Sequence, residues 1–381
     1  MKEVNVVLIE GDGIGPEVTQ SAVQVINHVL DQSGKKINWI KAPAGDKALQ
    51  EYGDRLPEQT IDLIKQHKLA LKGPLTTPVG KGERSLNVRI RQLFDLYQSI
   101  RPVRYFSPIK TPVKNPKLVD FVIFRENIED VYAGIEWKQG SEEAKKLISL
   151  LKSDFNVQIR EDSGIGIKPI SEFRSKRLVR AACEYAKKNK SKSVTLVHKG
   201  NIMKYTEGAF REWGYEVAIK EFGFITEEEA KQGNPENKII IKDRIADDMF
   251  QQVLLKPQEY DVIATMNLNG DYLSDACAAQ VGGIGIAPTA NIGDDVAMFE
   301  ATHGTSPSSA GLNKANPTAL ILAGSMLLEH VGFKKESKKI IKAIQKTFKQ
   351  KKMTYDLARS TPNAIQLSTS DFTKAVIENL G

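Results

Sequence analysis

Apolar runs that alternate with helical patterns constrain the fold of this chain more than any other feature. Residues 4–9, 119–124 and 262–266 each form a run of strand length, and apolar residues recur at helical spacing in residues 18–30 and 174–187. Strands and helices in this order predict an α/β protein. The chain has 381 residues, which is long for a single hydrophobic core, so we expect two domains.

The composition excludes several other classes of protein. Apolar residues make up 41% of the chain and charged residues 27%, which is typical of a soluble globular protein. No apolar run approaches the roughly 20 residues of a membrane span, and residues 4–9 resemble a buried strand, not a signal peptide. Cys183 and Cys277 have no paired spacing, so we expect a reduced, cytoplasmic protein without disulfides or a thiolate metal site.

The net charge of +7 raises the alternative of a nucleic-acid-binding protein. Much of the excess lies in lysines between Lys334 and Lys352, where Ile340, Ile344 and Phe348 recur at helical spacing. This pattern favours the solvated face of an amphipathic helix. A nucleic-acid surface would need aromatic residues among the basic ones, and little besides Phe333 and Phe348 is available. We therefore expect no specific nucleic-acid partner.

The glycine-rich segment Glu10–Pro16 (EGDGIGP) follows a predicted strand and precedes a predicted helix. It fits neither G-x-G-x-x-G, because Pro16 replaces the last glycine, nor the P-loop. We interpret it as a tight turn with Pro16 in the first turn of the helix.

An arginine-rich region indicates anion binding. Arg91, Arg101 and Arg125 offer forks that bind carboxylates bidentately, and Ser85 and Asn87 offer neutral donors beside them. Ser85 is expected just before the first turn of a helix, where backbone N–H groups favour an anion.

The alternative is a set of surface arginines, each balanced by an acid such as Asp95 or Glu126. We accept it for Arg89. For the other three arginines anion binding is the better interpretation, although spacing alone does not decide between the two.

Asp271 and Asp275 follow the predicted strand 262–266 and are four residues apart. A helix that begins near Tyr272 would place both carboxylates on one face, where they suit a hard divalent cation. Alternatively, Asp271 is a helix N-cap and Asp275 an exposed acid.

Lys199 and Tyr132 are candidates for proton transfer, each on the evidence of a single residue. Lys199 follows a predicted strand and is expected at the carboxyl end of the sheet, where burial or a metal would favour a general base. Tyr132 is a candidate proton donor, although a packing role is the commoner one. His303 lies in a loop without a His or Cys partner, which argues against a catalytic triad or a zinc site.

Six stretches resemble the metal-dependent β-decarboxylating dehydrogenases, and in particular bacterial dimeric isocitrate dehydrogenases; they are residues 73–80, 84–91, 124–132, 198–204, 267–275 and 300–305. The resemblance runs from Ile9 almost to the C-terminus. It implies an α/β fold of the isocitrate/isopropylmalate dehydrogenase type, unlike the Rossmann fold. It further implies a large domain (residues 1–96 and 282–381), a small domain (97–129 and 172–281), a clasp (130–171) and a homodimer with shared active sites.

The resemblance also implies roles for individual residues. Isocitrate would contact Ser85, Asn87, Arg91, Arg101 and Arg125. Mg²⁺ or Mn²⁺ would bind Asp271, Asp275 and the partner's Asp247, and Tyr132 with the partner's Lys199 would form the acid–base pair. The cofactor would contact Thr77, Glu300, His303, Gly304, Ser308, Ser309, Asn316, Tyr355 and Arg359. The reaction implied is oxidation and decarboxylation of isocitrate to 2-oxoglutarate, a step of the tricarboxylic acid cycle.

Two alternatives within the family concern the substrate and the cofactor. Homoisocitrate or isopropylmalate is the alternative substrate, but polar Ser85 and Asn87 suit a carboxylate better than an isopropyl group. NADP⁺ is favoured over NAD⁺ because no acid lies between Thr302 and Asn316, and Tyr355 and Arg359 occupy phosphate-contact positions. However, Ser308 and Ser309 replace the usual lysine and tyrosine, and Ala315 is typical of NAD-dependent relatives. We therefore expect a moderate preference for NADP⁺.

Overall fold

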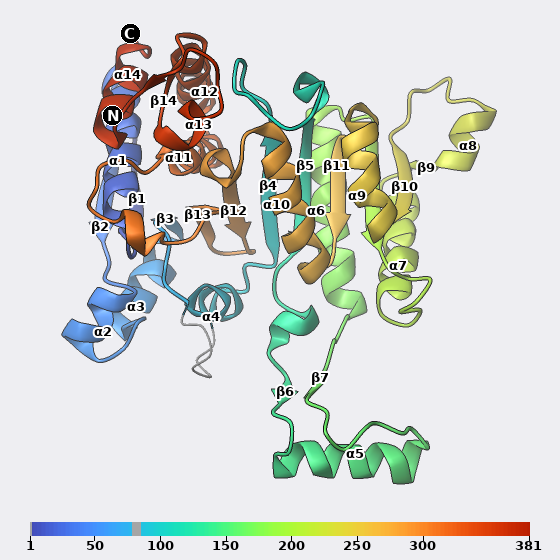
Figure 1. Cartoon of the computed structure of the whole chain (residues 1–381). Helices are drawn as coiled ribbons and strands as arrows, with labels where there is room; N and C mark the ends of the chain where they lie inside the picture. The colour runs from blue at the N-terminus through green and yellow to red at the C-terminus, as the bar shows by residue number, and fades with distance from the viewer. Residues whose placement is uncertain (1, 78–84) are drawn as a thin grey trace.

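A computed structural model describes residues 2–77 and 85–381, and one mixed sheet forms its centre (Figure 1). Within these residues the sheet has eleven strands. Their spatial order is β2 (Lys35–Lys41), β1 (Lys2–Ile9), β3 (Leu69–Lys72), β13 (Ala297–Ala301), β12 (Pro288–Ile292), β4 (Gln98–Arg104), β5 (Asp120–Glu126), β11 (Val262–Thr265), β8 (Ser193–His198), β10 (Ile240–Ile245) and β9 (Ile225–Thr226).

Most neighbouring strands run parallel, and the exceptions meet in the middle of the sheet. β12 is antiparallel to both β13 and β4, and β4 is antiparallel to β5. The predicted boundary between large and small domains falls between β12 and β4, where Ala290 pairs with Ile100. The sheet therefore continues across that boundary.

Long helices cover the sheet, and their apolar stripes explain why they form. Pro16 lies in the first turn of α1 (Gly15–Asp31), and Val18, Ala22 and Val25 in that helix are fully buried. The other helices of eight or more residues are α3 (Glu58–His67), α4 (Leu86–Leu93), α5 (Glu142–Phe155), α6 (Glu172–Asn189), α7 (Glu207–Lys220), α9 (Ala246–Leu255), α10 (Asn267–Val281), α11 (Thr318–His330), α12 (Lys334–Lys349) and α14 (Thr369–Glu378).

Short elements complete the fold. They include α2 (Asp46–Tyr52), α8 (Glu227–Gln232), α13 (Tyr355–Ala358), the paired strands β14 (Lys352–Met353) and β15 (Ile365–Gln366), and the 3-10 helix η2 (Asp130–Ala133). Among the residues that the structure describes, no helix combines the length and apolarity needed to cross a membrane.

The Gly11–Gly15 loop is the tight turn that we expected. Gly11 has φ +82° and Gly13 has φ +59°. A Cβ atom on Gly13 would lie 2.1 Å from the Thr305 carbonyl oxygen, and one on Gly11 would lie 2.3 Å from that of Pro74. The glycines therefore allow this loop to pack closely against two other loops.

An arm extends away from the sheet in Figure 1. Strands β6 (Glu136–Trp137) and β7 (Ile165–Gly166) pair antiparallel and lead to α5. The polar stretch 137–146 is helical in its second half. Helix α5 begins there because Ser141 caps it, its Oγ accepting a hydrogen bond of 3.2 Å from the Ala144 N–H.

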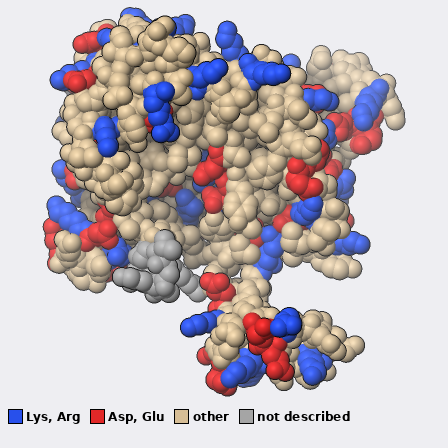
Figure 2. All heavy atoms as spheres, in the orientation of Figure 1, with Lys and Arg blue, Asp and Glu red and all other residues tan. Residues whose placement is uncertain are grey.

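The basic stretch 334–352 is mostly an amphipathic helix. In α12, Ile340, Ile344 and Phe348 are fully buried, and Phe333 just before it is 1% exposed. These aromatic rings are therefore unavailable for stacking on bases. On the face drawn in Figure 2, basic and acidic side chains are interspersed, which is further evidence against a nucleic-acid surface there.

Candidate active site

Two buried arginines and two aspartates meet where β4, β5 and α10 come together. Arg125, at the carboxyl end of β5, donates from Nε and Nη2 to Asn267 Oδ1 at 3.0 and 2.7 Å and forms an ion pair with Asp271. Arg101 Nη1 lies 3.6 Å from Asp271 Oδ1 and 3.7 Å from Asp275 Oδ1. The two arginines are 1% and 6% exposed, so they are not surface arginines.

Helix α10 begins at Asn267, so our prediction of a start near Tyr272 was wrong. The Leu268 N–H in its first turn donates to the Asp130 carboxylate at 2.9 Å, which satisfies one of the N–H groups that have no partner within the helix. Glycine suits position 270 because a Cβ there would lie 2.6 Å from Arg125 Cγ and would clash with that side chain. Asp271 is thus an interior helix residue and not an N-cap, and Asp275 follows one turn later on the same face.

The two aspartates differ in their electrostatic surroundings. Burial would raise the pKa of Asp271, but Arg125, Tyr132 and Arg101 outweigh burial and lower it. Burial raises the pKa of Asp275 despite the opposing effect of Arg101. Burial, assisted by Arg101, lowers the pKa of Arg125 to about 9, which still leaves the guanidinium charged at neutral pH. Asp271 is therefore an anion held between cations.

Tyr132 contacts this centre from η2. Its hydroxyl donates to Asp271 Oδ2 at 2.6 Å, and the Arg125 guanidinium lies 4.9 Å from its ring centroid. Burial raises the pKa of Tyr132 to about 12, partly offset by Arg125 and assisted by Asp271. The phenol is therefore protonated at neutral pH, as a proton donor must be.

Lys199 and Asp247 form a second, separate pair. Lys199 directly follows β8, and its ammonium forms an ion pair with Asp247 in the first turn of α9. Their side chains are 31% and 69% exposed. Within the described residues, no hydrogen bond or ion pair joins this pair to Asp271, Asp275 or Tyr132. One chain thus holds two groups of predicted catalytic residues that do not touch.

A cavity of about 310 Å³ adjoins the arginines. Three buried polar atoms at its lining residues have no hydrogen-bond partner among the described residues: Asn87 Oδ1, Arg91 Nε and His303 Nε2. Thr77, Arg101, Glu300 and Gly304 also line it. These polar groups are suited to a polar, anionic ligand.

Glu300 is held by partners that the sequence did not indicate. Lys72 Nζ lies 2.6 Å from Glu300 Oε2, while Arg91 Nη2 and Asn291 Nδ2 donate to Oε1 at 3.1 and 2.5 Å. Burial would raise the pKa of Glu300, but Lys72 and Arg91 hold it well below its usual range. The only available signal was a lysine that ends the apolar strand Leu69–Lys72.

Ser85 lies where we predicted, at the N-cap position of α4. Its Oγ is 3.1 Å from Thr77 Oγ1, at one edge of this region. Arg89 pairs with Asp54, and both side chains are about half exposed, so Arg89 is a surface arginine as expected. The matched stretches 73–80 and 84–91 include Pro78, Val79, Gly80 and Arg84, which lie outside the described residues.

A second cavity, of about 260 Å³, shares His303 and Gly304 with the first. Ser309, Asn316 and Tyr355 line it, as does Asp356, which we had not singled out and which accepts a hydrogen bond of 2.9 Å from Asn316. Ser308 and Arg359 are exposed and are not among its lining residues. The two cavities adjoin at the shared residues His303 and Gly304, an arrangement suited to a ligand with two parts, such as a dinucleotide.

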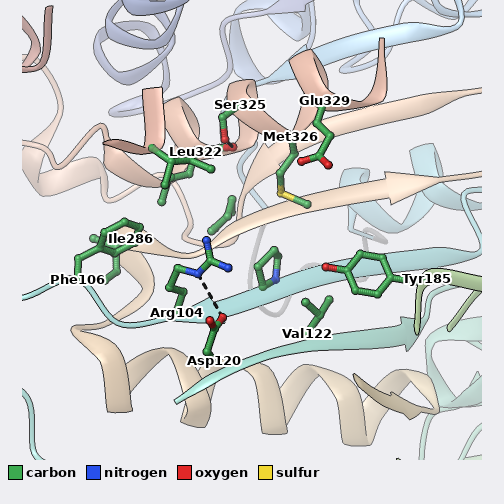
Figure 3. A pocket seen from close by; sticks show the side chains of 13 residues that line it. Arg104, Phe106, Asp120, Val122, Tyr185, Ile286, Leu322, Ser325, Met326 and Glu329 are labelled. Carbon is green, nitrogen blue, oxygen red and sulfur yellow. Dashed lines mark hydrogen bonds and ion pairs between the residues drawn. The ribbon is translucent and has the colours of Figure 1, made fainter. Parts of the chain in front are cut away.

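A third hollow, of about 150 Å³, lies apart from every predicted site residue (Figure 3). Arg104 and Asp120 pair at 3.2 Å on one side, and Leu322, Met326 and Glu329 of α11 lie opposite. Because its main ion pair is exposed and already satisfied, this hollow offers no reactive group.

Comparison with known proteins identifies the family to which this chain belongs. The family model described as isocitrate/isopropylmalate dehydrogenase matches residues 5–376. The chain belongs to that family. The predicted fold class is thereby confirmed, and the fold differs from the Rossmann fold.

Relatives within the isocitrate/isopropylmalate dehydrogenase family cover nearly the whole chain. "Isocitrate dehydrogenase [NADP]" of Archaeoglobus fulgidus is 58% identical over 377 residues, covering 97% of this chain and 91% of its own. The protein of the same name from Staphylococcus epidermidis is 51% identical, covering 98% and 94%. The crystal structure of isocitrate dehydrogenase from Methylococcus capsulatus superimposes with a TM-score of 0.84 at 37% identity, covering 99% of both chains.

Proposed function

We propose that this protein oxidises and decarboxylates isocitrate to 2-oxoglutarate and CO₂ with NADP⁺ as the hydride acceptor. The observation that carries the proposal is a polar cavity lined by Arg91 and Arg101, together with the contacts that Arg101, Arg125 and Tyr132 each make to Asp271. Relatives at 51–58% identity that are named NADP isocitrate dehydrogenases support it.

The arginines would bind the carboxylates of the substrate. Arg101 and Arg125 now contact Asp271, and a tricarboxylate could share their remaining N–H donors. Ser85 and Asn87 would contact the third carboxylate. These polar groups favour isocitrate over isopropylmalate, because a carboxylate can accept hydrogen bonds from the Ser85 hydroxyl and the Asn87 amide N–H, whereas an isopropyl group cannot.

Asp271 and Asp275 supply oxygen donors of the type that Mg²⁺ and Mn²⁺ prefer. Within the described part of one chain, no group of three or more His, Cys, Asp or Glu side chains is placed to hold a metal. We propose that the partner subunit's Asp247 completes the set. When bound there, the cation would stabilise negative charge on the substrate oxygens.

Tyr132 and the partner subunit's Lys199 would handle the protons. In its neutral amine form, that lysine would accept the proton of the substrate hydroxyl as hydride leaves the carbon that bears the hydroxyl for NADP⁺. After CO₂ is lost, Tyr132 would protonate the carbon that carried it, since the phenol hydroxyl already points at Asp271 in the centre.

The cofactor would extend through both cavities, its nicotinamide end near Thr77 and Glu300 and its adenine end near Asn316 and Tyr355. Ser308, Ser309, Tyr355 and Arg359 would receive the 2′-phosphate. Serines donate hydrogen bonds without charge, so we propose a preference for NADP⁺ that is weaker than in a relative with a lysine at position 308.

The split between the two groups of catalytic residues supports a homodimer with shared active sites. The arm is suited to subunit contact, because Leu150 and Phe155 of α5 and the nearby Val157 are 45%, 66% and 44% exposed. We propose that residues 130–171 form the clasp and that the domains divide as predicted.

A steady-state substrate panel tests this function. Purified protein would be assayed with isocitrate, homoisocitrate and 3-isopropylmalate, each with NADP⁺ and with NAD⁺, in Mg²⁺, Mn²⁺ or EDTA. We expect the highest kcat/KM for isocitrate with NADP⁺ and no turnover in EDTA. A higher kcat/KM for either other substrate would contradict the assignment.

A further inference from the structure

A buried series of ionic contacts connects the two groups of catalytic residues within each chain. Lys168 Nζ lies 2.7 Å from Asp130 Oδ1 and 2.9 Å from Glu207 Oε1. Both carboxylates are fully buried, and the lysine side chain is 19% exposed. We call these three residues the charged bridge.

The Asp130 end of the bridge holds Tyr132. Its carboxylate accepts hydrogen bonds from the Val131 N–H at 2.7 Å and from the Leu268 N–H at 2.9 Å. Asp130 has φ +71°, a conformation that non-glycine residues adopt only when their surroundings enforce it. These contacts fix η2 against the start of α10, and Tyr132, two residues after Asp130, donates to Asp271 of the same helix.

The Glu207 end holds the backbone of Lys199. Glu207 Oε2 accepts the Lys199 N–H at 2.5 Å and the Asn269 side-chain amide at 2.9 Å. The segment that presents the Lys199 ammonium is therefore tied to the first turn of α10. Both ends of the bridge thus converge on this helix.

The charges of the bridge are compatible with burial. Burial would lower the pKa of Lys168, but Asp130 and Glu207 outweigh it and raise that pKa, so the ammonium stays charged. One ammonium cannot neutralise two carboxylates. The remaining negative charge is stabilised by backbone N–H donors, including one at the N-terminus of α10. Buried ion pairs add little net stability compared with apolar packing. A role in geometry is therefore the better explanation for this one.

We propose that Asp130, Lys168 and Glu207 are positioning residues that hold Tyr132 and Lys199 as one rigid unit. This inference rests on the proposed function, in which Tyr132 serves one active site of the dimer and Lys199 serves the other. Each bridge then supports both active sites.

A charge-neutral variant, D130N/K168M/E207Q, tests the role without leaving a buried charge unpaired. Asn tolerates a positive φ, so the backbone at position 130 is preserved. We expect kcat to fall about 10- to 100-fold, because small misplacements of catalytic groups have effects of this size. The KM for isocitrate should change less, since no bridge residue contacts Arg91, Arg101 or Arg125. The single variant K168R, which keeps the charge, should retain most of the activity.

Heterodimers whose two subunits carry different affinity tags test whether the bridge of one subunit affects both active sites or only one. Pairing wild type with Y132F leaves one site intact, so about half the activity should remain. Pairing wild type with the neutral-bridge variant should leave far less than half, because each site takes one catalytic residue from the altered chain.

Retention of half the activity in that second heterodimer, or an unchanged kcat in the neutral-bridge homodimer, would overturn the inference. So would a rise in KM as large as the fall in kcat. Pairing Y132F with K199M tests the sharing of sites independently, so failure of the dimer proposal is distinguishable from failure of the bridge.

Discussion

The charged groups of the site fall into two kinds of surroundings. In the buried centre, Arg101 and Arg125 are at most 6% exposed and already contact Asp271. On the exposed rim, Lys199 and Asp247 pair in solvent, and Arg359 is exposed. The centre can keep its geometry without help from another molecule, because its charges are fixed by partners from three elements.

On the rim, Glu207 holds the backbone of Lys199, but the Lys199 ammonium and the Asp247 carboxylate depend on one partly exposed ion pair. Exposed ion pairs are weak and screened by salt, so the position of Asp247 is not determined by Lys199 alone. The difference teaches that this chain carries one preorganised half of an active site, and for the other half a Lys199 whose backbone is held while its ammonium and Asp247 rest on an exposed ion pair. The predictions below test that distinction, beginning with the largest expected effect.

Replacing Asp271 with Asn should damage the centre most. The variant keeps the size of the side chain but loses an oxygen donor and the charge between Arg101 and Arg125. We expect kcat/KM to fall at least ~1,000-fold, since metal-assisted charge stabilisation is worth several kcal/mol. Metal titration followed by isocitrate kinetics measures it. Full activity of D271N in EDTA would be incompatible with a metal at this position.

The second-largest effect is expected when a fixed negative charge is introduced at the edge of the buried centre. Ser85→Asp places a carboxylate at the N-cap of α4, facing the substrate's own carboxylate. Repulsion of about 3 kcal/mol in partly screened surroundings corresponds to a roughly 100-fold higher KM for isocitrate. Ser85→Ala is the matched control and should change KM far less. An unchanged KM in S85D would show that Ser85 lies away from the substrate.

On the rim, Arg359→Ala should affect only the choice of cofactor. Arg359 is exposed, so its contact with a 2′-phosphate would be partly screened. We expect kcat/KM for NADP⁺ to fall about tenfold, the low end for a charge-assisted contact, with little change for NAD⁺. Arg180→Ala, which removes an exposed arginine that pairs with Glu221, is the control. An equal loss with both cofactors would contradict the phosphate role.

A separate effect, on the free energy of unfolding and not on catalysis, concerns the pH dependence of stability at Glu126. Burial raises the pKa of Glu126, next to Arg125, to about 7, while its carboxylate accepts backbone N–H groups of Ile128 and Glu129. The folded state therefore binds more protons than the unfolded chain, and stability decreases as pH rises from about 4.5 to 7. Glu126→Gln removes this titration and should flatten the dependence by at most about 3 kcal/mol. Denaturant unfolding at several pH values measures it, and identical pH profiles would refute it.

The sequence predicted those parts of the fold that depend on local patterns. The buried strands, the N-cap position of Ser85 and the amphipathic α12 each follow from periodicity or capping within one segment. The start of α10 did not, because Asn267 and Gly270 are poor helix formers locally. Only Arg125, which lies against Gly270 from β5, and Asp130, which accepts the Leu268 N–H, make that turn favourable.

For the candidate site, the sequence indicated which residue types to consider but not how they pair. Residue types identified the arginines and aspartates, but not that Arg125 would pair with Asp271. Lys72 and Lys168 were missed because each acts through a partner far away in the sequence, Glu300 or the pair Asp130 and Glu207. No local pattern distinguishes such lysines from solvated ones.

Complementation between inactive subunits tests the two-part active site most directly. Y132F and K199M would be purified as homodimers and then combined as a doubly tagged heterodimer. Both homodimers should be nearly inactive with isocitrate and NADP⁺. In the heterodimer, one site would receive Tyr132 and Lys199 from different chains and the other would receive neither, so about half of the wild-type activity should return. A heterodimer as inactive as its parents would show that each chain completes its own site, and would contradict the account.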